Sequence, residues 1–103
     1  MAATLEIKLV NRGDVGEFLL TGNLDTQTAP QAEEHFDAAA ERFGDLIINM
    51  QDMNYVSSAG LRVLKKLHVK MIKQGGKLTV TNVNDNIMEV FEITGFAGLL
   101  NIE

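Results

Sequence analysis

The chain has 103 residues, a single Pro and 46% hydrophobic residues, which together predict one globular domain spanning residues 1–103. It contains no Cys, so disulfides and thiol chemistry are excluded, and a reducing cytoplasm is the expected compartment. The net charge of −5 argues against nucleic-acid binding, and no apolar run reaches transmembrane length or forms a leader, so direct membrane insertion is not expected.

The first residues predict a β-hairpin. Apolar and polar residues alternate over 4–10, with Leu5, Ile7 and Leu9 on one side, as in a half-buried strand. Residues 11–14 have turn chemistry, and residues 15–21 predict a second strand that ends at Gly22-Asn23.

A helix is predicted after this hairpin. Residues 24–31 have the pattern of a strand-to-helix transition, in which Thr28 and Gln31 fit a capping box and Pro30 fits the first turn. Apolar residues then recur at helical spacing, and a glycine follows the last of them. The predicted buried stripe consists of Ala29, Ala32, Phe36, Ala39, Ala40 and Phe43.

The most apolar strand is predicted over 46–50 and is expected to be central. A polar loop follows it, and then a helix over 61–73 that Gly75-Gly76 ends. The buried side of this helix is expected to carry Leu61, Leu64, Leu67, His68, Met71 and Ile72. Six of the nine basic residues fall between positions 62 and 77, and either a solvated helix face or a partner surface explains this cluster.

The last third predicts a strand over 77–81, a short helix capped by Asn84 or Asp85, and then a helical turn and an edge strand within 96–102. The resulting order, β-β-α-β-α-β-α-β, predicts an α/β fold with a mixed sheet and helices packed on it. Functional turns of such sheets lie at the carboxyl ends of strands. The turns at Asp25 and at Ser57-Ser58 are therefore expected to be neighbours.

Catalytic and metal chemistry find little support in the residues. The only histidines, His35 and His68, fall in different predicted helices, so no metal site is expected. Neither Ser57 nor Ser58 lies in a Gly-x-Ser-x-Gly pattern, so a serine hydrolase is not expected. The Gly75-Gly76 pair precedes a strand, not a helix, and does not form a phosphate loop. No cofactor is predicted.

The two serines do predict a binding switch. They lie where a strand passes into a helix, and the first N–H groups of a helix favour a hydroxyl cap or a phosphate. A phosphoserine adds close to two negative charges. The fold would tolerate that charge here, whereas a partner that buries the turn would have to desolvate it.

The run over 49–61, NMQDMNYVSSAGL, resembles the signature of the STAS domain, which sulfate transporters and anti-sigma factor antagonists share. Three further stretches resemble the family in the same order. These are Gly22–Thr26 before the first helix, Gly75–Leu78 with Asn82-Val83 after the second, and Val90–Leu99 near the end.

The resemblance implies partner switching. In the family, an antagonist binds an anti-sigma factor, often a serine kinase, and so frees a sigma factor. Phosphorylation by that kinase ends binding, and a phosphatase restores it. The resemblance thus implies a cytoplasmic antagonist that is a ligand, not an enzyme. Its partner-binding residues are expected to be Asp25, Thr26, Met53, Asn54, Tyr55, Val56, Ser57, Ser58, Ala59 and Arg62, with Met53 as an adaptable contact from the loop.

One position departs from the family pattern. Alignment on Gly60-Leu61 puts Ala59 at the usual phosphoacceptor position, and Ser57 where the family commonly has Asp. Either Ser58, or Ser57, accepts phosphate instead, or Ser58 serves only as helix cap and contact residue. The departure keeps open a non-phosphorylated STAS scaffold, or an accessory subunit of a signalling assembly or membrane transporter complex. A small-ligand or nucleotide-binding domain is a third reading.

Overall fold

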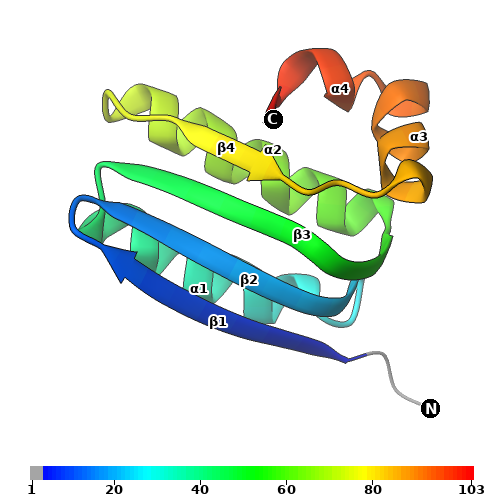
Figure 1. The fold of residues 1–103 in the computed structure, drawn as a ribbon, viewed down its shortest axis with the longest axis horizontal. Coiled ribbons are helices and arrows are strands. Elements are labelled where there is room, and N and C mark those ends of the chain that lie inside the picture. The colour runs from blue at the N-terminus through cyan, green and yellow to red at the C-terminus, as the bar shows by residue number, and fades with distance from the viewer. Residues whose placement is uncertain (1–3) are drawn as a thin grey trace.

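A five-stranded sheet organises the computed structural model, which describes residues 4–103 (Figure 1). The strands lie side by side in chain order, with β1 antiparallel to β2 and the remaining pairs parallel. The expected mixed sheet is therefore confirmed, while residues 1–3 of the expected domain lie outside the described residues. The strands are β1 (Leu5–Arg12), β2 (Val15–Leu24), β3 (Asp45–Val56), β4 (Leu78–Thr81) and β5 (Asn101–Ile102).

Two long helices cover one face of the sheet. In Figure 1, α1 (Ala29–Arg42) lies behind β1 and β2, and α2 (Ser58–Lys73) lies behind β3 and β4. The shorter α3 (Asp85–Thr94) contacts β3, and α4 (Phe96–Leu99) leads into β5. The predicted order of strands and helices is thus confirmed. None of the helices within residues 4–103 is long and apolar enough to cross a membrane.

The core lies between the sheet and the two long helices. Phe18 of β2 and Phe36 of α1 meet edge to face at 5.0 Å between ring centroids, and both are fully buried. Phe18 pairs in the sheet with Ile48 of β3, which is also buried. All six residues of the stripe predicted for α1 are buried. This burial confirms that the 3.6-residue apolar period marks the side of α1 that packs on the sheet.

Both central strands are longer than expected. The predicted ends of β2 at Gly22-Asn23 and of β3 at Met50 are wrong, since the strands continue to Leu24 and Val56. They pair in parallel over this stretch, with register shifts after Leu19 and after Gly22. Because this pairing satisfies the backbone N–H and C=O groups, a stretch of polar side chains still forms strand there.

Two expectations about the helix ends and faces are wrong. Thr28 precedes α1, but its hydroxyl makes no cap bond and donates instead to the Asn23 carbonyl at 2.8 Å. The amide of Gln31 donates to the Leu5 carbonyl at 3.2 Å, so no capping box forms. Ile72 is 56% exposed, whereas Val63, on the flank that faces α1, is buried in its place.

Candidate functional site

The two predicted turns meet at one edge of the sheet. Leu24, the last residue of β2, pairs with Val56, the last residue of β3. The Ser57 N–H then donates to the Leu24 carbonyl oxygen at 2.9 Å, which ties the start of α2 to the end of β2. The expectation that the Asp25 and Ser57-Ser58 turns are neighbours is confirmed, because parallel strands bring their carboxyl ends together.

The two serines have different positions at the start of α2. Ser57 is the N-cap, and its Oγ accepts the Gly60 N–H at 3.3 Å while its carbonyl accepts the Leu61 N–H at 2.9 Å. Ser58 is the first helical residue and is exposed. The expectation that Ser58 caps the helix is therefore wrong, and its hydroxyl is available at the surface.

Replacing the cap is expected to weaken the fold. Ser57→Ala removes the acceptor for the Gly60 N–H, and the free energy of unfolding should fall by about 1 kcal/mol. Ser57→Asp keeps an acceptor at the cap and should retain most of the stability. Urea unfolding followed by circular dichroism measures both, and an equal loss in the two variants would contradict the assigned role of the hydroxyl.

The neighbouring turn is held by its own side chains. The Asp25 Oδ1 accepts the N–H groups of Gln27 at 2.9 Å and Thr28 at 3.1 Å. The buried Thr28 hydroxyl accepts the Asp25 N–H at 2.9 Å and donates to Asn23. The carboxylate of Asp25 thus orders the loop, and it presents Thr26 at the surface.

The end of β3 separates surface residues from core residues. Asn54 is exposed, and Tyr55 is 53% exposed although it is aromatic. Met53 and Val56 are buried, with only 2% and 3% of their surface exposed. The expectation that Met53 is an adaptable loop contact is therefore wrong. The reason is that β3 continues through this stretch and turns both side chains into the core. They support the surface from beneath.

A shallow hollow of about 240 Å³ lies between the two turns. Thr26 and Pro30 line one side, and Ala59 and Arg62 line the other. Arg62 is exposed four residues after Ser58, which places the two side chains on neighbouring turns of one helix face. Within residues 4–103, no three His, Cys, Asp or Glu side chains group as metal ligands would. The arrangement offers an ordered contact surface with hydroxyls and the cationic side chains of Arg62 and Lys66.

Three residues that support this surface were not predicted as part of it. The Leu24 carbonyl holds Ser57, the Thr28 hydroxyl closes the Asp25 turn, and the Asn84 side chain donates to the Met53 carbonyl at 2.9 Å. Asn84 was expected to cap α3, and it does so through the Ile87 N–H at 2.9 Å. Its second bond joins residues 31 positions apart, and no local pattern signals such a contact.

Comparison with known proteins gives one consistent result. The family model of the STAS domain matches residues 6–103. The anti-sigma-B factor antagonist of Bacillus subtilis (strain 168) is 32% identical over 92 residues, which cover 89% of this chain and 84% of that protein.

The fold is also found among solved structures. An anti-sigma factor antagonist from Mycobacterium paratuberculosis superposes with a TM-score of 0.85 at 21% identity, covering 96% of this chain and 85% of the other. The anti-sigma factor antagonist SpoIIAA in its unphosphorylated form superposes with a TM-score of 0.79 at 17% identity, covering 97% of this chain and 88% of the other. SpoIIAA of Bacillus in its phosphorylated form gives 0.73. At these identities the likeness to solved structures concerns the fold.

Proposed function

Because the chain belongs to the STAS domain family, we propose that it is an anti-sigma factor antagonist, which binds an anti-sigma factor and so releases a sigma factor. The observation that carries the proposal is the 32% identity to a named antagonist over 89% of this chain. In this role the protein regulates transcription as a binding partner in the cytoplasm, not as an enzyme, and residues 1–103 act as a single domain.

The partner-binding surface that we propose is the pair of turns at the carboxyl ends of β2 and β3. The exposed side chains and the ordered backbone there offer contacts that need little rearrangement, which reduces the entropy lost on binding. The exposed tyrosine supports this proposal, since aromatic residues often anchor protein interfaces. The surface comprises Asp25, Thr26, Asn54, Tyr55, Ser57, Ser58, Ala59 and Arg62.

We further propose that Ser58 is the residue phosphorylated by a kinase-like anti-sigma factor, and that a phosphatase reverses this. Three observations support Ser58 over Ser57. Its side chain is exposed, its hydroxyl is not the helix cap, and Arg62 lies one helical turn further on. A phosphate there would lie near the positive end of α2. The related SpoIIAA adopts this fold in both its unphosphorylated and phosphorylated forms.

Direct binding tests the proposal. The purified protein should form a stoichiometric complex with an anti-sigma factor encoded near its gene, as measured by calorimetry and size-exclusion chromatography. If that factor is a kinase, adding ATP should dissociate the complex and yield a phosphopeptide that contains Ser58. If the protein formed no complex with any such factor, the proposed function would be overturned. If it formed a complex but a digest covering the whole chain carried no phosphate, only the proposed switch would be removed.

The alanine at position 59 favours a second candidate. A STAS scaffold, or an accessory subunit of a signalling assembly or membrane transporter complex, would bind its partners without phosphorylation. Such a subunit should co-purify with a larger assembly, and a negative charge at Ser58 should leave its function unchanged. Genes for transporter subunits beside its own gene would point to this candidate, and genes for a kinase and a sigma factor would point to the first.

A further inference from the structure

The charges of this protein are separated along the chain. Residues 62–77 contain six basic and no acidic residues, so they contribute +6, while the rest of the chain contributes −11 to the net charge of −5. Five of the six cations belong to α2. A strongly basic surface on an acidic protein makes the local electrostatic potential positive. It therefore attracts anionic groups and repels the basic faces of other molecules.

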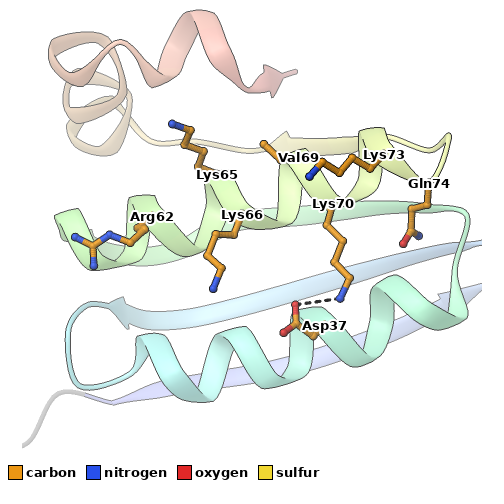
Figure 2. Close-up of a pocket in the computed structure, with 8 residues that line it drawn as sticks. All are labelled: Asp37, Arg62, Lys65, Lys66, Val69, Lys70, Lys73 and Gln74. Atoms are coloured by element: carbon orange, nitrogen blue, oxygen red, sulfur yellow. Dashed lines mark ion pairs between the residues drawn. The ribbon is translucent and has the colours of Figure 1, made fainter.

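These cations line a groove along the solvent face of α2. The groove has a volume of about 810 Å³, and Asp37 of α1 lies at its edge. Figure 2 shows Lys66 and Lys70 extending toward α1 and Lys65 extending to the other side of α2. We call this feature the basic groove and define it by Arg62, Lys65, Lys66, Val69, Lys70 and Lys73.

Only part of this charge is neutralised within the protein. Lys66 pairs with Glu33, and Lys70 pairs with Asp37 at 3.5 Å. The hydrogen bond and charge of Glu33 raise the pKa of Lys66. Among residues 4–103, no carboxylate forms an ion pair with Arg62, Lys65 or Lys73. Three cations spread over the length of α2 are therefore available to a ligand.

The basic groove also offers apolar contacts. Val69 lines it and is 36% exposed, and Ile72, which lies outside the groove lining on the same helix, is 56% exposed. The remaining apolar side of α2 is buried in the core, so α2 cannot insert an apolar face into a membrane. Cations interleaved with aliphatic side chains fit a segment that carries both carboxylates and apolar residues.

The basic groove is continuous with the proposed partner-binding surface. Arg62 and Lys66 line both the basic groove and the hollow between the two turns. The partner that binds the Ser57–Gly60 turn, as proposed above, also has the basic groove within reach. We infer that an acidic, amphipathic segment of that partner docks along the basic groove, an inference that rests on the proposed function. Nucleic acid fits less well, because the −11 carried by the rest of the chain opposes a polyanion.

A peptide titration tests this inference without the natural partner. The probe is a blocked peptide of the length of α2, with glutamates and leucines at helical spacing, and the ¹⁵N-labelled protein reports binding by NMR. Amide shifts should be confined to α2 and the facing side of α1, and added salt should weaken binding. The same peptide with glutamine in place of glutamate should bind at least about fivefold more weakly.

A pair of matched variants isolates the groove charges. Lys65→Gln/Lys73→Gln removes two cations that form no ion pair with any residue of the described part of the chain, and it should weaken peptide binding about fivefold. Lys8→Gln/Lys77→Gln removes the same charge from two exposed side chains that lie outside the basic groove, and the affinity should change less than twofold. Equal effects of the two variants would show that only net charge matters, and they would overturn the inference.

Other outcomes separate the inference from the function it rests on. Tighter binding to a DNA duplex or to phosphatidylserine vesicles than to the acidic peptide would overturn the groove assignment. An anti-sigma factor complex that is unaffected by Lys65→Gln/Lys73→Gln would also overturn it, while the antagonist function would stand. Failure of the wild-type protein to bind any anti-sigma factor would remove the function, and the peptide result would still decide whether the groove binds acidic segments.

Discussion

Replacing Ser58 by aspartate is expected to weaken anti-sigma factor binding by roughly a hundredfold or more while the fold survives. Ser58 is exposed at the first position of α2, where a carboxylate is stabilised by about 0.3–1 kcal/mol. A partner that covers the turn would bury this charge, and an uncompensated buried charge costs about 3–5 kcal/mol. Calorimetry measures the affinity, and thermal unfolding by circular dichroism measures the stability.

Ser58→Ala is the matched control for this substitution. It removes the hydroxyl and leaves the cap at Ser57 intact, so stability should be unchanged and affinity should fall by no more than about tenfold. An equal loss in the alanine and aspartate variants would show that the shape of the side chain, not its charge, matters at this position. Full affinity in Ser58→Asp would place the partner contact away from the turn.

Gly60→Ala is expected to lower the free energy of unfolding by about 1–3 kcal/mol and to disturb the same surface. A Cβ at this position would lie 2.5 Å from the Leu24 carbonyl oxygen and 2.8 Å from the Leu24 Cγ. That carbonyl also accepts the Ser57 N–H, so it cannot move away without weakening the bond that joins the two turns. Chemical denaturation measures the stability, and calorimetry with the anti-sigma factor measures the binding.

Gly98→Ala serves as the control for Gly60→Ala. Gly98 lies in α4, and among the described residues a Cβ there would meet nothing within 4 Å apart from its chain neighbours and the backbone of its own helix. The added methyl group should leave stability unchanged or raise it by up to about 1 kcal/mol, because alanine has the higher helix propensity. If Gly60→Ala behaved like Gly98→Ala, the close approach of α2 to the end of β2 would not be needed for the fold.

The candidate site shows where prediction from sequence was sufficient. The meeting of the Asp25 and Ser57 turns follows from the order of strands and helices, because parallel strands place their carboxyl ends at one edge. The cap of α2 lies at Ser57 and not at Ser58, whereas the cap at Asn84, one of the two positions predicted for α3, is a local feature whose side chain accepts a backbone N–H three residues further on. Short-range hydrogen bonds of this kind leave a recognisable residue pattern.

The exposure of the site residues could not be predicted from the local sequence. Met53 and Tyr55 both lie in the stretch predicted as a polar loop, yet one is buried and the other is half exposed. The difference arises because β3 continues there alongside β2, with register shifts that change which side chains turn inward. Register shifts depend on the partner strand, so the sequence of β3 does not contain the information needed to predict them.

The sequence by itself determined the elements, their order and the sheet type, because apolar periodicity and capping residues act within a few positions of the chain. Tertiary structure decided the lengths of β2 and β3, the burial of Val63 in place of Ile72, and which α2 cations form ion pairs within the described residues 4–103. The physical reason is that residues distant in the chain make these interactions. They form the hydrogen bonds of the backbone groups, bury the side chains and neutralise the charges.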